Sequence, residues 1–293
     1  SRQNKEDRKK MKRVFCIGNG ESRKGFDLEK LRQHGKIYGC NALYRDFKPD
    51  ALVSVDHGIM HEIYHSGYAK DNVCYFRDWT PVPQMHYDMM VYAGLDKVQQ
   101  DALAKWDVKK ENEKGDSDEF VMHGCNLNGL AKILHKTGKI EEKHVNSNQL
   151  AISWVKPDKV TSIDKVAPDY KDHGWAAGAT SGWVATNIEK PKEVYLIGHD
   201  LNSLNDRVNN VYKGTKHYVT PHNSVTPSVN WIDQWNTLMT WKPNIKYYKV
   251  NTSLTRIHEN DKVNLELPEW QRHKTEGRLE YIDYQRLDKL LGL

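Results

Sequence analysis

The chain has 293 residues, enough for one large domain or two small ones with a sizeable core, and nine Trp and fifteen Tyr supply much of its apolar surface. No apolar stretch approaches the roughly 20 residues that a membrane span needs, and no signal peptide opens the sequence, so we expect a cytoplasmic protein without a transmembrane segment. The four cysteines are scattered and form no Cys-x-x-Cys pair, which argues for reduced thiols and against a structural zinc site.

The net charge of +5 comes from one end of the chain. Residues 1–13 hold seven Lys or Arg against two acids, whereas the remaining residues hold 37 of each sign. We therefore expect residues 1–12 to form a flexible basic arm, either simply solvated or able to bind phosphate, rather than one edge of a basic face.

Short apolar runs predict the first strands of a parallel sheet, at residues 14–17, 36–41, 50–56 and 72–76. Between the first two, the apolar spacing of residues 26–35 predicts a short amphipathic helix with Gly35 as its C-cap. Residues 78–122 are rich in Tyr, Met and Pro and then in charge, which predicts an insertion or a lid. Residues 125–138 again have the helical period.

The second half of the chain continues the alternation of helix and strand. Residues 178–190 predict a helix capped by Thr180 or Ser181, and residues 193–198 predict a strand. Residues 231–241 predict a helix that Pro243 stops, and a last strand ends at Asn251. This pattern predicts an α/β domain over residues 13–256, doubly wound and Rossmann-like, with a mostly parallel sheet. Residues 257–293 are expected to form a helical or irregular extension.

The ends of the predicted strands carry small or hydrogen-bonding residues. In open α/β sheets, ligands bind outside the carboxyl ends of the strands, so these residues are candidates for one site. They suit a polar, hydroxyl-rich ligand that carries phosphate. The candidates are Gly18, Asn19, Gly20 and Ser22 after the first strand, Asn41 after the second, Asp56 after the third, and Gly198 and Asp200 after the strand at 193–198.

Two of these motifs have a structural alternative. Gly-Asn-Gly lets the backbone approach a ligand closely, but a tight strand-to-helix turn needs glycine equally. The run Thr180, Ser181 and Gly182 at a helix start offers free amides and hydroxyls to a phosphate, but most Ser or Thr there are ordinary N-caps.

A long polar loop follows Asp200 and carries the candidates for catalysis. A histidine there can take a proton from an acceptor hydroxyl, and a tyrosine hydroxyl or a lysine can neutralise a departing phosphate. The catalytic candidates are Tyr212, His217, Tyr218 and His222.

Five blocks of the sequence, in this order, resemble the bacterial lipo-oligosaccharide sialyltransferases. They are "VFCIGNGESRKGFDLEKL", "YGCNALY", "ATSGWVATN…KEVYLIGHDL", "KHYVTPH" and "IKYYKVNTSL". The blocks also resemble the motility-accessory-factor and 6-hydroxymethylpterin diphosphokinase-like family, which has counterparts of "PDALVSVD" and "LIGHDL". The match covers roughly residues 13–56 and 175–256.

The first resemblance implies a GT-A-type fold and a metal-independent enzyme. Gly18, Asn19 and Gly20 would contact the nucleotide of a donor, and His222, or else His217, would be the general base. Tyr218 would help to bind the leaving phosphate, and Tyr212 would replace a phosphate-binding tyrosine that is Asn202 here. Asn41, Thr180, Ser181 and Asp200 would complete the donor site. Glu21 and Gly178 replace a proline and an arginine of the family pattern, so sialic acid is not implied.

We weigh three functions for this sequence. The first is an inverting, metal-independent glycosyltransferase that uses a nucleotide sugar and needs no cofactor. Its acceptor would be a surface glycan or a hydroxymethylated base of phage-type DNA, and a homo-oligomer is possible. The second is an Mg²⁺-dependent diphosphokinase of the pterin type, with Asp56 and Asp200 as metal ligands. The third is a non-catalytic module that binds nucleotide or glycan.

Overall fold

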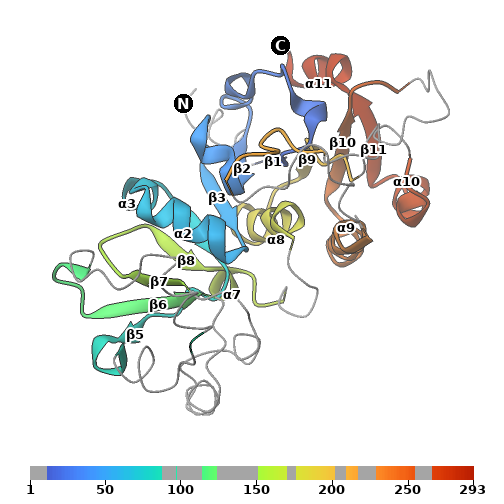
Figure 1. Cartoon of the computed structure of the whole chain (residues 1–293). Helices are drawn as coiled ribbons and strands as arrows, with labels where there is room; N and C mark the ends of the chain where they lie inside the picture. Colours follow the sequence, from blue (N-terminus) through green and yellow to red (C-terminus); the bar gives the residue numbers. More distant parts are fainter. Residues whose placement is uncertain are drawn as a thin grey trace, which may run out of the picture. The chain divides into compact units, whose positions relative to one another are not determined.

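The computed structural model of the chain describes residues 12–87, 97, 114–123, 151–169, 176–201, 209–216, 229–254 and 266–293 (Figure 1). Two compact units make up the chain: unit 1 comprises residues 1–53 and 166–293, and unit 2 comprises residues 54–165. The predicted basic arm, apart from Lys12, and the predicted helix at 125–138 lie outside the described residues.

Unit 1 is built on a parallel sheet with the strand order β11-β10-β9-β1-β2-β3. Its strands are β1 (Arg13–Ile17), β2 (Lys36–Cys40), β3 (Ala51–Ser54), β9 (Glu193–Ile197), β10 (Lys246–Asn251) and β11 (Leu279–Asp283). The central strands β1 and β9 are apolar and buried after their first residues, Arg13 and Glu193, because both faces of the sheet are covered. The prediction of an α/β fold with a mostly parallel sheet is confirmed.

The strand predicted to be last is not the last one. Strand β11 follows β10 along the chain and pairs with it in parallel, with Val250 opposite Ile282. Residues 279–283 therefore extend the sheet, and the expected helical or irregular extension over 257–293 is corrected at this point. Only Leu279 and Ile282 of β11 are buried, and its other three residues are half-buried, so this strand gives a weaker apolar signal in the sequence than the central strands do.

Helices cover both faces of the unit 1 sheet (Figure 1). Helix α8 (Ala177–Glu189) and helix α9 (Val229–Trp241) pack together on one face, where Ser181 of α8 hydrogen-bonds to the Cys16 thiol of β1. On the other face, α11 (Tyr284–Leu291) meets the short helix η1 (Glu21–Arg23), since the Tyr284 hydroxyl donates to the Ser22 carbonyl at 2.9 Å.

The helix predicted at residues 26–35 is only one turn long. It is the 3-10 helix η2 (Leu28–Leu31), whose N-cap Asp27 accepts a hydrogen bond from the Glu29 amide. Gly35 does not cap it. Gly35 lies instead where a Cβ would stand 2.5 Å from the Arg13 carbonyl oxygen, so this glycine lets the start of β2 approach β1 closely.

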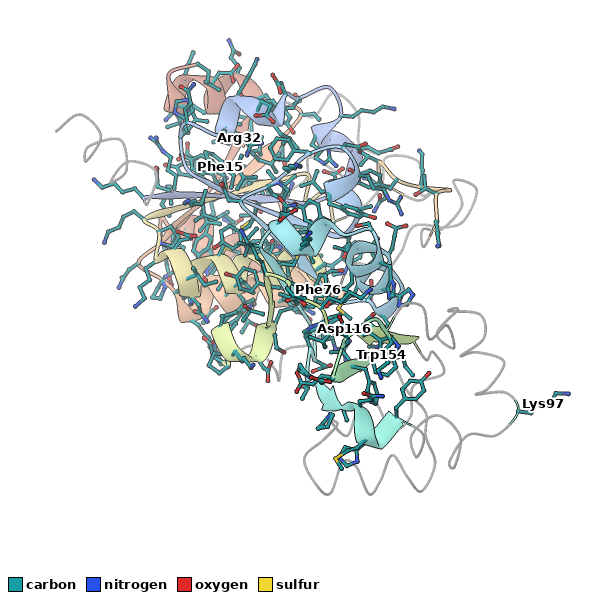
Figure 2. All side chains as sticks on the ribbon, turned by 90° about the vertical axis from the view of Figure 1, so that its left-hand side faces the viewer. Phe15, Arg32, Phe76, Lys97, Asp116 and Trp154 are labelled. Atoms are coloured by element: carbon teal, nitrogen blue, oxygen red, sulfur yellow. The ribbon has the colours of Figure 1, made fainter. Side chains whose placement is uncertain are left out.

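Aromatic rings pack in register across the sheet. Phe15, Tyr195 and Tyr248 occupy paired positions on β1, β9 and β10. Tyr195 and Tyr248 stack at 4.7 Å, and Phe15 lies 5.1 Å from Tyr195. Figure 2 labels Phe15 among the side chains that fill the two sides of this sheet. Ring contacts of this kind add to the aliphatic side chains that also fill the core of unit 1.

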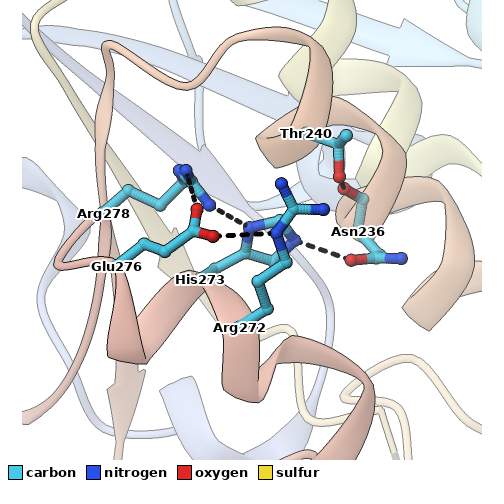
Figure 3. Close-up of polar contacts among 6 residues, drawn as sticks. All are labelled: Asn236, Thr240, Arg272, His273, Glu276 and Arg278. Atoms are coloured by element: carbon cyan, nitrogen blue, oxygen red, sulfur yellow. Dashed lines mark hydrogen bonds and ion pairs between the residues drawn. The ribbon is translucent and has the colours of Figure 1, made fainter.

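A buried histidine ties the C-terminal elements of unit 1 together (Figure 3). His273 of α10 (Gln271–Thr275) donates from Nε2 to Asn236 Oδ1 of α9 at 2.6 Å, and its Nδ1 accepts from Arg278 Nη1 at 2.8 Å. Both bonds together define the neutral Nε2–H form of the ring. Burial and then the neighbouring Arg278 lower the pKa of His273. The 3-10 helix η7 (Pro268–Trp270) precedes α10.

Unit 2 contains a parallel strand pair and a small antiparallel sheet. Strand β4 pairs with β8, and the antiparallel sheet has the order β5-β6-β7. Tyr87, Phe120 and Trp154 pack against one another over it, and Figure 2 labels Trp154. The elements are α2 (His57–His65), α3 (Tyr68–Asp71), β4 (Cys74–Phe76), β5 (Val82–Pro83), η4 (Gln84–His86), β6 (Glu119–His123), β7 (Ala151–Trp154), β8 (Val160–Ser162) and α7 (Ile163–Val166).

Candidate functional site

The chain order of the strands reverses in the middle of the unit 1 sheet. From β1 the chain runs outward through β2 to β3, and later it runs outward in the other direction from β9 through β10 to β11. The point of reversal lies between the neighbours β1 and β9. In open parallel sheets the ligand crevice forms outside the carboxyl ends of the strands at such a point. The turns that follow β1 and β9 are therefore the candidate site.

The glycines of these two turns let the backbones touch. A Cβ on Gly18 would stand 2.5 Å from the Gly198 carbonyl oxygen, and a Cβ on Gly20 would stand 2.5 Å from the Asp200 carboxyl carbon. Gly198 has φ +74°, and a Cβ on it would stand 2.6 Å from the Gly18 carbonyl oxygen. Packing between the two strand ends is thus sufficient to explain the two glycines of the Gly-Asn-Gly motif, a reason that differs from the tight strand-to-helix turn given as the structural alternative.

Asp200 fixes the turn after β1. Its Oδ2 accepts from the Ser22 amide at 2.9 Å and from Asn209 Nδ2 at 3.0 Å, and its Oδ1 accepts from the Ser22 hydroxyl. Asp200 is 6% exposed. The carboxylate is therefore an organising group with three donors already bound, and binding a metal ion would compete with them.

Asn19 joins three separate segments. Its Nδ2 donates to the Cys40 carbonyl at the end of β2 at 3.1 Å, and its Oδ1 accepts from Arg23 Nη2 at 3.2 Å. Its own carbonyl accepts from the Val211 amide at 2.9 Å. Asn19 is buried, and both the amide nitrogen and the amide oxygen of its side chain form hydrogen bonds within the protein. Asn19 therefore positions the turn in this structure.

Residues 209–216 lie against the turn after β1 and carry Tyr212. The guanidinium carbons of Arg23 and Arg45 each lie 5.9 Å from the centroid of the Tyr212 ring. Burial and, second, a hydrogen bond to Asp46 raise the pKa of Tyr212 to about 12, so the phenol keeps its proton at neutral pH. Lys213 Nζ pairs with the Glu21 carboxylate at 2.6 Å.

Two ionisable groups are buried beneath these turns. His199 donates from Nε2 to the Cys16 carbonyl at 2.9 Å, and burial lowers its pKa to about 4, so it is neutral and part of the core. Lys249 is 2% exposed and donates to Asn251 Oδ1 at 2.7 Å. Burial lowers the pKa of Lys249 to about 8, against the opposing effect of Asp200.

The predicted helix cap at Thr180 or Ser181 is wrong. Helix α8 begins three residues before Thr180, with Ala176 as its N-cap. The Thr180 hydroxyl donates to the Ala176 carbonyl and the Ser181 hydroxyl to the Gly178 carbonyl, as buried hydroxyls within a helix do. Gly182 faces α9, where a Cβ would stand 2.5 Å from Trp235. These three residues pack the core, and the helix-start phosphate site expected of them is not formed.

The other candidates occupy different places. Asn41 follows β2 directly and begins the 3-10 helix η3 (Asn41–Arg45) with φ +53°. Asp56 precedes α2 in unit 2 and is exposed. The predicted catalytic residues His217, Tyr218 and His222, and Asn202, lie outside the described residues.

Arg23 and Arg45 are the site residues that the sequence analysis missed. Arg23 sits between the two strand ends, donating from Nε to the Gly18 carbonyl at 2.8 Å. Arg45 reaches the segment after β9, donating to Thr215 Oγ1 at 2.9 Å and to the Lys216 carbonyl at 3.1 Å. Their position a few residues beyond the strand-end motifs was the available signal.

A second polar cluster, in unit 2, has the spacing of a functional motif. His61 and His65 stand one helical turn apart on α2, with ring centroids 4.0 Å apart, and Ser153 Oγ lies 3.5 Å and 3.2 Å from their nitrogens. Ser153 is fully buried, so it cannot reach a substrate. In the part of the chain that the structure describes, no three His, Cys, Asp or Glu side chains are grouped to hold a metal ion.

No family model, curated protein or solved structure matches this chain. Among the described helices, none combines the length and the apolar character needed to cross a membrane. What the site does must therefore be inferred from its own residues.

Proposed function

We propose that unit 1 binds a nucleotide sugar at the carboxyl edge of its sheet and transfers the sugar to a hydroxyl acceptor. One observation carries the proposal: the turns after β1 and β9 meet at the point where the strand order reverses, which is where this architecture places its ligands. The resemblance of five ordered blocks to glycosyltransferases is consistent with it and adds the GT-A-type comparison. In this proposal, residues 78–122 act as a lid.

The proposed reaction inverts the anomeric carbon. His222 takes the proton of the acceptor hydroxyl, and the acceptor oxygen attacks the anomeric carbon from the face opposite the nucleotide. The bond between that carbon and the donor phosphate oxygen breaks, and the nucleotide leaves with both bonding electrons. Cations near the phosphate, rather than a metal ion, stabilise the charge that develops there.

The carboxylate of Asp200 weighs against the diphosphokinase alternative. That alternative needs Asp200 and Asp56 as metal ligands, but three donors already occupy the Asp200 oxygens. For the acceptor, a surface glycan and a hydroxymethylated base of phage-type DNA both remain within the proposal. A flipped DNA base would require a positive groove to follow the phosphate backbone.

Calorimetry on the full chain tests donor binding. UDP-, GDP- and CMP-sugars are titrated in the presence of EDTA, and we expect one of them to bind without added metal. Absence of binding to all of them contradicts the proposal. Activity that appears only with Mg²⁺ and ATP would support the diphosphokinase instead.

A pair of variants tests the base. His222→Ala is expected to lower the turnover by about 100-fold or more, the usual contribution of a general base, with little change in donor affinity. His217→Ala is the matched control from the same loop. Equal turnover in wild type and His222→Ala removes its role, and a loss confined to His217→Ala transfers that role.

A further inference from the structure

We infer that unit 2 contains a binding site for a divalent transition-metal ion such as Zn²⁺, with His61 and His65 of α2 as its protein ligands. The site lies in a different unit from the proposed transfer reaction and does not depend on it. Three features support it: the spacing of the two histidines along the helix, the point on which their nitrogens converge, and the contacts that hold the helix in place.

The two histidines have the spacing of a zinc-binding motif. Residues 61–65 read His-Glu-Ile-Tyr-His, which is the pattern His-Glu-x-x-His. On a helix this pattern places two imidazoles one turn apart on the same face, where both can bind one zinc ion. All five residues belong to α2, and the ring centroids of His61 and His65 lie 4.0 Å apart. The two rings therefore stand side by side, as the pattern requires.

The ring nitrogens of the pair converge on one oxygen atom. His61 Nδ1 lies 3.5 Å from Ser153 Oγ of β7, and His65 Nε2 lies 3.2 Å from the same atom. These distances are at or beyond the upper end of normal hydrogen-bond lengths. Ligand atoms that are about 2.1 Å from a tetrahedral zinc ion lie about 3.4 Å from one another. The spacing of the three atoms thus matches a coordination sphere with one nitrogen from each histidine.

This point lies at the boundary between the core of unit 2 and solvent. Ser153 is fully buried, His61 is half-buried and His65 is exposed. An ion can therefore reach the pair beside His65, and water can fill the coordination positions that the protein does not supply. Among the residues that the structure describes, no third His, Cys, Asp or Glu is grouped with the pair. The inference is accordingly metal binding by two imidazoles, without a metalloprotease activity.

The helix that carries the pair is fixed in place by the intervening Tyr64. The Tyr64 hydroxyl donates to Asp158 Oδ2 at 2.6 Å and accepts from the Lys156 amide at 2.9 Å. Its ring packs against Trp79, with centroids 4.8 Å apart. These contacts hold α2 against the segment that follows β7. Metal ligands on an element that is already fixed need little reorganisation when the ion binds.

Both histidines make further interactions, and these are compatible with metal binding. A ligating histidine binds the ion through one nitrogen, and a second group normally holds the ring through the other nitrogen. Neutral imidazole is a preferred ligand of Zn²⁺, Cu²⁺ and Ni²⁺, whereas Mg²⁺ prefers oxygen ligands. The expected ion is therefore a transition metal.

Calorimetry on the full chain tests the inference. The protein is treated with EDTA, the EDTA is removed, and the protein is titrated with ZnCl₂ and separately with MgCl₂. We expect Zn²⁺ to bind at least about tenfold more tightly than Mg²⁺, because the ligands are nitrogens. Equal affinities, or no binding of Zn²⁺, would overturn the inference.

Single variants locate the bound ion. His61→Ala and His65→Ala should each lower the Zn²⁺ affinity by at least about tenfold, since the loss of even an outer-shell partner commonly costs that much. His86→Ala is the matched control, because His86 is a half-buried histidine of η4 in the same unit, and its affinity should be unchanged. Full binding in both variants of the pair, or equal losses in all three variants, would overturn the inference.

A second readout separates metal binding from misfolding. Circular dichroism without zinc shows whether each variant is folded. If an alanine variant is not, His61→Gln or His65→Gln replaces it, because glutamine keeps a hydrogen-bond donor and acceptor but is not among the usual zinc ligands. Saturating Zn²⁺ should raise the urea midpoint of the wild type and leave that of His65→Gln unchanged. A rise of equal size in His65→Gln would overturn the inference.

Discussion

Gly20→Ala tests whether the two strand ends interlock as described. Gly20 has φ −66° and ψ 149°, which alanine adopts freely, so the backbone conformation is not strained by the change. The new Cβ would, however, stand 2.5 Å from both the carboxyl carbon and Oδ2 of Asp200 and 2.6 Å from the Gly198 carbonyl oxygen. The cost of the substitution comes from these contacts alone.

The expected loss of stability is about 3 kcal/mol. Overpacking costs about 1–3 kcal/mol, and displacing one hydrogen bond of the Asp200 carboxylate costs about 1.5–3 kcal/mol more. The lower entropy of an unfolded chain with alanine returns only about 0.4–1 kcal/mol. Neither partner can move freely, because Asp200 is bound to Ser22 and Asn209, and Gly198 accepts from the Gly20 amide at 2.8 Å.

Urea unfolding followed by circular dichroism measures this loss, with the slope of the transition compared between variants. The control is Gly25→Ala, in which the φ of +86° strains alanine by about 1–2 kcal/mol but no atom lies within 4 Å of the Cβ. In an Asp200→Ala background the cost of Gly20→Ala should fall to about half, because one of its two contacts is gone. If Gly20→Ala costs no more than Gly25→Ala, the reasoning about the strand ends is refuted.

Three further predictions concern unit 1. Because the pKa of His199 falls from 6.5 to about 4 on folding, its contribution to the free energy of unfolding is complete above pH 6.5, and about 3 kcal/mol is lost as the pH falls to 4. In a plot of the free energy of unfolding against pH, His199→Gln should reduce this fall on the acid side. An unchanged acid side would contradict the assignment of a buried neutral histidine. Arg278→Gln should raise the pKa of His273, measured by NMR titration, since Arg278 lowers it now (Figure 3); a constant or lower pKa argues against their contact. Gly182→Ala should lower the free energy of unfolding, measured in urea, by about 1–2 kcal/mol, because the new Cβ would clash with Trp235. The better helix propensity of alanine offsets only part of this loss. A gain in stability would show that α8 and α9 lie further apart than described.

The positions of most strands along the chain and the residues at their ends could be predicted from the sequence because both are local signals. Apolar runs such as residues 14–17 and 194–197 are continuous when a strand is buried on both faces, and both strands end where expected. Strand β11 was not predicted, since its pattern is short and half-exposed. The helix at 26–35 was over-predicted, because an apolar period does not determine whether one turn or three will form.

The roles of individual site residues could not be predicted, because they depend on contacts between distant segments. Thr180 and Ser181 look like a helix start in sequence, but the helix begins earlier because Ala177 and Ala179 continue it backward. Asp200 looks like a ligand and serves as an internal anchor for Ser22 across 178 positions of sequence. Arg23 and Arg45 follow the strand-end motifs by a few residues, but their shared position, each 5.9 Å from the centroid of the Tyr212 ring, depends on the fold.

The glycines after β1 illustrate why a motif for phosphate binding can mislead. A close approach of two backbones and a close approach of a backbone to a phosphate both require the absence of a Cβ, so sequence cannot distinguish them. At Gly18 and Gly20 the space that a Cβ would need is already occupied by Gly198 and Asp200. The glycines thus bring the turns after β1 and β9 together. Under the proposed function, the positive charge for a ligand would come from side chains on the outside of these turns. Arg23 contacts both features, because its Nε donates to the carbonyl of Gly18 in the packed turn and its guanidinium carries a positive charge.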